Sequence, residues 1–219
     1  MDFPSFKNEL QYLARNYDFV IGCDEVGRGP LAGPVVAAAC LLDPARIGEG
    51  RNENDWYYRV RDSKTINEKE REVLQKKILD NSLAYGVGEV KEEEIDEINI
   101  HNATLSAMRR AIEQLLGKIS TAPTHKILIL IDGKFKIPDI LNIEQQSVID
   151  GDAKILSIAA ASIIAKVHRD NIMREMDRKF PLYGFAQHKG YGTKEHWKAL
   201  KKWGPTSIHR KSFINTITS

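Results

Sequence analysis

Cysteine is scarce in this chain of 219 residues, which contains only Cys23 and Cys40. Both lie in apolar, strand-like runs, where a free thiol is usually buried and reduced. No secretory signal peptide is apparent, so nothing in the sequence requires an oxidising compartment, and we expect a cytoplasmic protein. A chain of this length buries a hydrophobic core without disulfides.

Long hydrophobic runs and a dominant charge are also missing. The longest apolar runs, residues 35–42 and 127–131, are too short to cross a bilayer, so we expect no membrane association. The net charge is only +2, but it is unevenly distributed. Residues 166–219 contain 12 basic and 4 acidic residues, a net +8, which leaves −6 for the rest. This asymmetry fits either a C-terminal surface for a polyanion or a solvated helix face.

Periodicity and turn residues predict an α/β protein. The expected strands are residues 19–24, 34–42, 83–90, 126–131 and 144–149. The expected helices are residues 1–17, 65–81, 92–97, 100–117, 153–179 and 194–203. The continuous apolar run 126–131 is typical of a strand that is buried on both faces of an α/β sheet. We therefore predict an α/β domain over residues 1–180, followed by a helical extension of the same domain over residues 181–219.

Two adjacent carboxylates, Asp24 and Glu25, come directly after the first apolar strand. The turn Gly27-Arg28-Gly29 follows them. Carboxylate oxygens are ligands that Mg²⁺ prefers, glycines allow close approach of the backbone to a ligand, and arginine binds phosphate well. Together they suggest phosphodiester chemistry, although a solvated strand end is the simpler alternative. Successive strand side chains point to opposite faces, so a shared metal requires the strand to twist or end here.

Two further aspartates fall where a site is expected. Asp132 ends the predicted strand 126–131, and Asp152 precedes the predicted helix 153–179. Ligands in open α/β folds gather at the carboxyl ends of strands. Clustered carboxylates repel each other unless cations neutralise them, and nucleases use two metals about 3.5–4 Å apart. The alternatives are a turn at Asp132 and a helix N-cap at Asp152. Asp170 is explained by helical ion pairs with Lys166 and Arg174.

Several short motifs occur in an order that resembles ribonuclease HII, the type 2 ribonuclease H. They are residues 24–34, 62–64, 130–133, 151–152, 160–170 and 185–191. The resemblance covers about residues 19–213. The tail, residues 212–219, shows no hydrophobic-aromatic clamp-binding peptide of the archaeal and eukaryotic type, so the bacterial form is the closer likeness.

The resemblance implies a ribonuclease H-like fold, with a mixed five-stranded sheet flanked by helices and a helical C-terminal region. It implies Mg²⁺ or Mn²⁺ held by the catalytic carboxylates of Asp24, Glu25, Asp132 and Asp152. It further implies cleavage of the RNA strand of RNA–DNA hybrids and incision 5′ to a single ribonucleotide embedded in duplex DNA, leaving a 3′-hydroxyl and a 5′-phosphate. We expect a monomer whose partners are these nucleic acids.

The resemblance also assigns substrate-binding residues. Gly27, Arg28 and Gly29 would contact the ribose 2′-hydroxyl and a neighbouring phosphate, and Lys64 would contact the backbone. Tyr191 would stack on the sugar of the following deoxynucleotide and sense the RNA-to-DNA junction. The physics fits these roles, because the 2′-hydroxyl distinguishes RNA from DNA, and a site built to bond a hydroxyl rejects the analogue that lacks it.

Two rival interpretations stay open at this point. A ribonuclease HIII should carry an extra N-terminal domain and lack the Gly27-Arg28-Gly29 turn, whereas about 18 residues precede the first strand here. A non-catalytic protein that binds RNA–DNA hybrids on the same fold should have lost a metal carboxylate. The sequence departs from the family at Ala159, where a serine is usual, and in residues 48–61, which are longer and more aromatic than expected.

Overall fold

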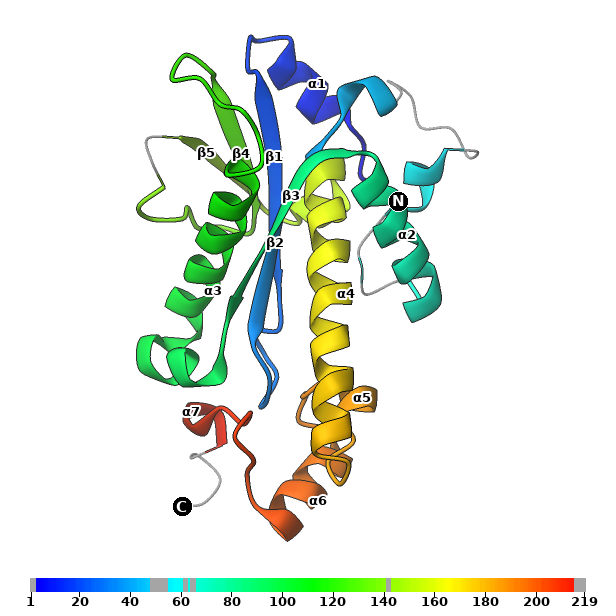
Figure 1. Cartoon of the computed structure of the whole chain (residues 1–219), viewed down its shortest axis with the longest axis vertical. Coiled ribbons are helices and arrows are strands. Elements are labelled where there is room, and N and C mark those ends of the chain that lie inside the picture. Colours follow the sequence, from blue (N-terminus) through cyan, green and yellow to red (C-terminus); the bar gives the residue numbers. More distant parts are fainter. Residues whose placement is uncertain (1–2, 48–54, 61–62, 64–65, 141–142, 215–219) are drawn as a thin grey trace.

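The computed structural model describes residues 3–47, 55–60, 63, 66–140 and 143–214. Its strands are β1 (Phe19–Val26), β2 (Val35–Leu42), β3 (Ser82–Val90), β4 (Ile127–Asp132) and β5 (Glu144–Val148). They form a five-stranded sheet in the order β3-β2-β1-β4-β5 (Figure 1). The pairs β1–β2 and β2–β3 are antiparallel, whereas β1–β4 and β4–β5 are parallel. The predicted mixed α/β sheet is confirmed.

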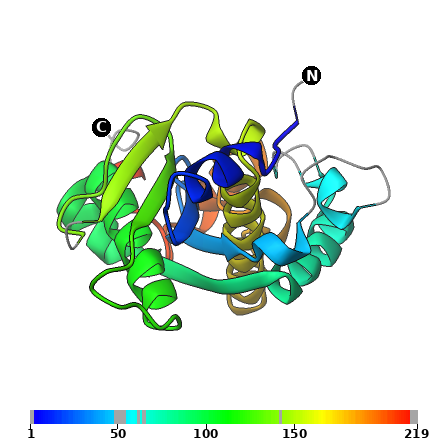
Figure 2. The same ribbon diagram turned by 90° about the horizontal axis from the view of Figure 1, so that it is seen from above.

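Helices cover both faces of this sheet (Figures 1 and 2). The helix α3 (Glu92–Leu116) packs on one face, and α4 (Leu156–Lys179) packs on the other, with α2 (Glu68–Asp80) beside it. The remaining helical elements are α1 (Lys7–Leu13), η1 (Pro44–Arg46), η2 (Trp56–Arg59), η3 (Gly151–Ala153), α5 (Phe185–His188), α6 (Lys194–Trp203) and α7 (Lys211–Ile214).

The alternation of β2 explains the two main hydrophobic cores. Val36, Ala38 and Cys40 face α4 and α2, and the residues between them face α3. All eight residues of β2 are buried, as expected for a strand covered by helices on both sides. At about 25 cal/mol per Å² of apolar surface removed from water, these two interfaces are the main favourable contribution to folding.

Glycine and alanine bring α4 unusually close to the sheet. A Cβ built on Gly22 of β1 would lie 2.2 Å from the main-chain carbon of Ser157, so only glycine fits there. Alanines at positions 159–161 and 165 of α4 are fully buried. This close packing places the N-terminal half of α4 directly beside the carboxyl half of β1.

Several element boundaries differ from the prediction. The first helix, α1, is much shorter than residues 1–17. The two predicted helices 92–97 and 100–117 are present but joined, with Asn99 at φ 65° marking the break between them. The long helix begins at Leu156 rather than at residue 153, because residues 151–153 form a separate 3₁₀ turn. Residues 185–188, which lie outside the expected helices, form the short helix α5.

Part of the aromatic segment 48–61 packs on the body of the protein. Within its described part, Tyr57 is buried and joins the core that faces α4. None of the helices in the described part of the chain has the length and apolar character that a membrane crossing demands.

The C-terminal segment docks through a hydrophobic cluster of its own. Tyr183, Phe185 and Ile208 pack with Met173 of α4 and Ala32 of the β1–β2 loop. The isolated bridge between Ala32 and His209 joins the same two regions. Residues after α4 are therefore packed directly against the loop that carries the Gly27-Arg28-Gly29 turn.

Candidate active site

The strand β1 extends beyond the pairing with its parallel neighbour β4. The pairing with β4 runs as far as Cys23 opposite Ile131, whereas the pairing with β2 continues to Val26. Asp24 and Glu25 therefore lie inside β1, which ends at Val26 rather than at the predicted residue 24, with only β2 paired at their level. The strand does not need to end for both carboxylates to reach one edge of the sheet.

Asp24 and Glu25 project to opposite faces, as strand geometry requires. Asp24 shares the face of Ala38, and its carboxylate accepts a hydrogen bond from the Ser162 hydroxyl of α4. Glu25 lies opposite Ala37 on the face covered by α3 and lines a cleft there. The two carboxylates therefore flank the free edge of β1 rather than stand side by side.

Asp132 and Asp152 approach this edge from β4 and η3. Asp132 is the last residue of β4, and its Oδ1 accepts a hydrogen bond of 2.7 Å from the Gly151 amide. Asp152 lies in η3, and the N-cap of α4 is Ile155, so the N-cap interpretation of Asp152 is wrong. The bond to Gly151 fixes the turn that carries Asp152 beside the end of β4.

Electrostatics show that the four carboxylates are neighbours. The pKa of Asp24 is raised well above its usual value, first by burial and then by the charges of Glu25, Asp132 and Asp152. The pKa of Glu25 is also raised by burial and by Asp132, although Arg28 opposes this. The Arg28 guanidinium lies 3.3 Å from Oε1 of Glu25. The structure thus brings together all four carboxylates that the sequence singled out.

This carboxylate cluster suits a hard divalent cation in its chemistry. Its members offer only oxygen donors, and a cation would remove the repulsion and the burial penalty that raise the pKa of Asp24. In the described part of the chain, however, no three His, Cys, Asp or Glu side chains are already arranged to hold a metal ion. The carboxylates straddle the strand edge, so side chains must turn toward it to share a metal.

A cleft of about 240 Å³ opens on the α3 side of these carboxylates. Glu25, Arg28 and Asp132 form its floor, and residues of α3 and of the loop after β4 form its walls. Across the cleft mouth, His101 packs edge-on against the half-exposed ring of Phe135, with 4.7 Å between ring centroids. Two of the four carboxylates, Glu25 and Asp132, therefore share this cleft with Arg28.

The Gly27-Arg28-Gly29 turn is held from behind by two buried arginines. Arg210 donates hydrogen bonds to the carbonyls of Gly27, Arg28 and Gly33, at 2.6–3.0 Å. Gly27 has φ +92°, and a Cβ there would lie 2.3 Å from Nε of Arg169. The turn therefore exposes Arg28, whose side chain is 46% accessible, while its carbonyls are tied down.

Tyr191 lies beside this turn, as the resemblance implies. Its ring edge lies 3.8 Å from the position that a Cβ on Gly29 would take, and the side chain is 44% exposed. Lys64 lies outside the described residues. Its neighbour Ser63 is buried, and the Ser63 hydroxyl lies 3.0 Å from that of Ser162, which in turn bonds Asp24.

Sequence reasoning missed the buried arginines and histidines that support the site. Arg169 and Arg210 contribute to the basic C-terminal charge in the sequence, yet both are fully buried. His196 and His209 are also buried, with Nε2 atoms 3.0 Å apart. Asp170 pairs with Lys166, as predicted, but its second partner is Arg71 of α2 rather than Arg174. No local pattern distinguishes such residues from surface charges.

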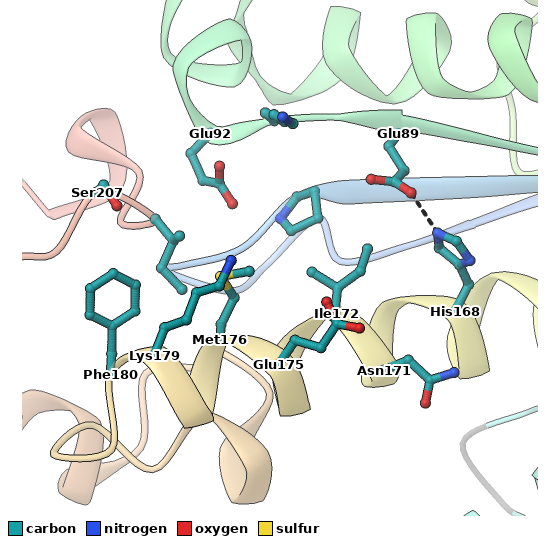
Figure 3. A pocket seen from close by; sticks show the side chains of 13 residues that line it. Glu89, Glu92, His168, Asn171, Ile172, Glu175, Met176, Lys179, Phe180 and Ser207 are labelled. Carbon is teal, nitrogen blue, oxygen red and sulfur yellow. Dashed lines mark hydrogen bonds and ion pairs between the residues drawn. The ribbon is translucent and has the colours of Figure 1, made fainter.

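A larger cavity of about 700 Å³ lies between the start of α3 and the C-terminal half of α4 (Figure 3). Glu89 and His168 face each other there with a hydrogen bond of 2.5 Å. None of the predicted site residues lines this cavity. This cavity is therefore separate from the residues that the sequence singled out.

Comparisons with known proteins agree with the geometry. The ribonuclease HII family profile matches residues 21–216. Ribonuclease HII of Caldicellulosiruptor bescii is 50% identical over 214 residues, which cover 98% of this chain and 95% of that protein.

Solved structures of low sequence identity share the fold. The structure titled as the PCNA:RNase HII complex from Archaeoglobus fulgidus matches with a TM-score of 0.67 and 24% identity, over 88% of this chain and 93% of that one. Bst-RNase HIII in complex with Mn²⁺ matches with a TM-score of 0.68 and 20% identity, over 90% of this chain and 68% of that one. The family profile and the relative at 50% identity go further than the fold: this chain belongs to the ribonuclease HII family.

Proposed function

We propose that this protein is a divalent-metal-dependent endoribonuclease. It cleaves the RNA strand of RNA–DNA hybrids and incises duplex DNA on the 5′ side of a single embedded ribonucleotide, leaving a 3′-hydroxyl and a 5′-phosphate. One observation carries the proposal: four carboxylates, whose charges raise the pKa of Asp24 and of Glu25, lie directly beside a turn whose arginine lines the cleft.

Asp24, Glu25, Asp132 and Asp152 would hold the metal in this proposal. When bound, Mg²⁺ or Mn²⁺ would supply an activated water and neutralise charge on the attacking and leaving oxygens. The Mn²⁺ in the similar Bst-RNase HIII structure supports a divalent cation and leaves the choice between the two ions open. The chain's own contribution is a set of carboxylates held near one strand edge by β1, β4 and η3.

Arg28 has two partners in this scheme. In the structure its guanidinium pairs with Glu25 at 3.3 Å, and its side chain is half-exposed. A phosphate at the cleft would compete for the same guanidinium, because arginine binds phosphate oxygens in a bidentate manner. Substrate would thus draw Arg28 from Glu25 and leave that carboxylate free to serve as a ligand.

The Gly27-Arg28-Gly29 turn and Tyr191 would read the sugar. Main-chain groups of the turn can bond a 2′-hydroxyl without any preference for a base, which suits an enzyme that acts on any ribonucleotide. An exposed tyrosine ring next to Gly29 can stack on the next sugar and thereby sense where RNA changes to DNA. Lys64 would contact the backbone from the segment beside Ser63.

The basic C-terminal extension would bind the duplex backbone. The extension packs against α4 and against Ala32, which belongs to the same loop as the Gly27-Arg28-Gly29 turn. The exposed lysines of α6 are thereby attached firmly to the part of the protein that carries this turn. We retain residues 1–180 as the catalytic unit and residues 181–219 as its substrate-binding extension within this proposal. The monomeric state and the cytoplasmic location stay predictions.

The substitution Asp132→Asn tests the proposal. It keeps the size of the side chain and its acceptor oxygen for Gly151, but it removes a charge needed by a hard cation. We expect cleavage to fall by at least about three orders of magnitude, while binding of an RNA–DNA hybrid changes little. Asp139→Asn, an exposed position of the same loop, is the matched control and should cleave normally.

Cleavage of a labelled hybrid and its binding in EDTA give the two readouts. An active Asp132→Asn enzyme would remove this residue from the catalytic group. Loss of both binding and cleavage would point to a structural role for the Asp132–Gly151 bond instead.

A further inference from the structure

The backbone around Tyr191 is held in a strained conformation. Lys189 and Gly190 have φ values of +51° and +86°, in the left-handed region that costs a non-glycine residue free energy. The carbonyl of Lys189 accepts a hydrogen bond from Arg169 at 2.9 Å, and that of Gly190 accepts one from the Leu31 amide at 2.8 Å. The main chain is thus fixed, although the Tyr191 ring is exposed.

A directed chain of hydrogen bonds ends at the Tyr191 carbonyl. The Thr206 amide donates to Nδ1 of His209 at 2.9 Å, so the proton of neutral His209 is on Nε2. That proton points at Nε2 of His196, 3.0 Å away. Nδ1 of His196 then donates to the Tyr191 carbonyl at 2.9 Å. Because an amide only donates and a carbonyl only accepts, both tautomers are determined from the two ends of the chain.

The chain requires both imidazoles to be neutral. A second proton on Nε2 of His196 would face the N–H of His209 at 3.0 Å, and a second proton on Nδ1 of His209 would face the Thr206 amide at 2.9 Å. Burial lowers the pKa of His196 and of His209 to about 4, so both are neutral near pH 7. The groups packed around them are the stacked ring of His188 and the aromatic rings of Tyr183 and Phe185.

The surface proposed to read the ribose has two halves, Tyr191 and the Gly27-Arg28-Gly29 turn. The C-terminal segment that holds Tyr191 also supports the turn. Arg210 directly follows His209 and ties down the carbonyls of Gly27 and Arg28. Its amide donates to the Leu31 carbonyl at 2.9 Å, and the Ile208 carbonyl accepts from Gly33. Two consecutive residues therefore support the turn and, through His196, the tyrosine beside it.

We propose that His209 and His196 are positioning residues that set the Tyr191 ring against the Gly27-Arg28-Gly29 turn, so that residues 206–210 couple the two halves of the ribose-reading surface. This inference rests on the proposed function, because it assigns the pair to the junction-sensing role of Tyr191. In this proposal the histidines act through the Tyr191 main chain, whose carbonyl accepts the hydrogen bond from His196.

Two substitutions of His209 separate positioning from simple packing. His209→Gln places an amide donor where Nε2 stood, so the bond to His196 is retained. His209→Asn places its amide where Nδ1 stood, so it retains the contact with Thr206 but cannot reach His196. His125→Asn, a half-buried histidine before β4, is the control. Each protein is assayed for kcat/KM on a duplex with one ribonucleotide and on a long RNA–DNA hybrid.

We expect His209→Asn to lower the ratio of single-ribonucleotide incision to hybrid cleavage about five- to tenfold, the effect of removing one buried hydrogen bond. His209→Gln and His125→Asn should keep the wild-type ratio. In a Tyr191→Ala background, His209→Asn should lower the ratio no further. Equal losses on both substrates, or effects that multiply in the double variant, would overturn the assignment.

A spectroscopic measurement decides the inference independently of activity. Long-range ¹H–¹⁵N spectra of the wild-type protein at pH 7 should show His196 protonated on Nδ1 and His209 on Nε2. The Tyr191 ring resonances should shift in His209→Asn and not in His209→Gln. An Nε2-protonated His196 would refute the chain even if the enzyme is active. If the wild type cleaves neither substrate, the proposed function fails, while the tautomers and the ring shifts still test the positioning.

Discussion

At the scale of single residues, the site contains buried ionisable groups whose nearest described partners are not oppositely charged side chains. Asp24 lies near three other carboxylates, and Arg210 lies among carbonyls of Gly27 and Gly33. Burial raises the pKa of Asp24 and lowers that of Arg210 to about 9. Each group is retained at a cost in stability, which is the pattern expected of a functional site.

Arg210 should be sensitive even to a conservative substitution. Arg210 uses three nitrogens of its planar guanidinium for these carbonyls, whereas lysine has a single nitrogen that cannot reach all three positions, so Arg210→Lys should release the Gly27-Arg28-Gly29 turn. We expect at least a tenfold loss of cleavage and a decrease of about 2–4 kcal/mol in the free energy of unfolding. Assays of cleavage and urea denaturation provide both values.

Arg174→Lys is the matched control, because Arg174 makes only partly exposed ion pairs with Glu68 and Glu72. It should change stability by less than about 1 kcal/mol. Comparable effects of the two substitutions would mean that the carbonyl contacts of Arg210 do not support the turn.

Residue types and spacing singled out the four carboxylates and the Gly27-Arg28-Gly29 turn, because each belongs to a local motif, and the family resemblance added Tyr191. Their functional roles stay predictions. Arg210 and His196 could not be predicted in the same way. Their importance comes from partners 177–183 and 13 residues away in the chain, and nothing nearby marks them as buried. Strand alternation correctly predicts that Asp24 and Glu25 point to opposite faces of the sheet. That both lie at a free edge of β1 is seen only from the register with β4, whose pairing with β1 ends at Cys23.

At the scale of elements, the predicted boundaries failed where a turn precedes a helix. Asp150 adopts a left-handed conformation, and the 3₁₀ turn after it delays the start of α4 to Leu156. Helix periodicity does not distinguish such a turn from a first helical turn. The N-cap residue of this helix, Ile155, makes no side-chain hydrogen bond to the first helical turn. The Ser157 amide instead donates a hydrogen bond of 2.8 Å to the carboxylate of Glu9 in α1.

Glu9 links the docking of α1 to pH. Burial raises the pKa of this carboxyl to about 7, against 4.5 for the ordinary group, and Oε2 has no partner among the described residues. A raised pKa means that the stabilising contribution is complete below about pH 4.5 and is lost as pH rises through about 7. Above that pH the fold must bury a charged carboxylate.

Glu9→Gln should therefore stabilise the protein at pH 8 by about 1–3 kcal/mol relative to wild type, and much less at pH 5. Chemical denaturation at the two pH values measures the difference. The exposed Glu93→Gln is the control and should show no such pH dependence. A Glu9→Gln variant that is equally destabilised at both pH values would show that the charged form is tolerated in the fold.

At the scale of the whole molecule, the uneven charge has a structural counterpart. The basic C-terminal segment packs against the loop of the reading turn, and the lysines of α6 remain exposed on the same body. Charge alone left open whether this was a solvated helix face. The three-dimensional placement beside the turn favours contact with a phosphate backbone.

Replacing Lys201 and Lys202 with Gln should weaken substrate binding and its salt dependence. The slope of log K against log salt concentration should decrease by about 0.9 for each phosphate that a lysine no longer neutralises. Lys76 and Lys77, an exposed pair on α2, provide a matched double variant. Titrations at several salt concentrations should leave the slope of this control unchanged. Equal slopes for both double variants would remove α6 from the binding surface.

The central claim is tested most directly by incision of a labelled DNA duplex that contains one ribonucleotide, in Mg²⁺, Mn²⁺ or EDTA, beside an all-DNA duplex. We predict a nick on the 5′ side of the ribonucleotide with at least one metal, no nick in EDTA and an intact all-DNA control. A folded protein that leaves the ribonucleotide-containing duplex uncut with both metals, or that cuts the all-DNA duplex equally well, would contradict the proposed function.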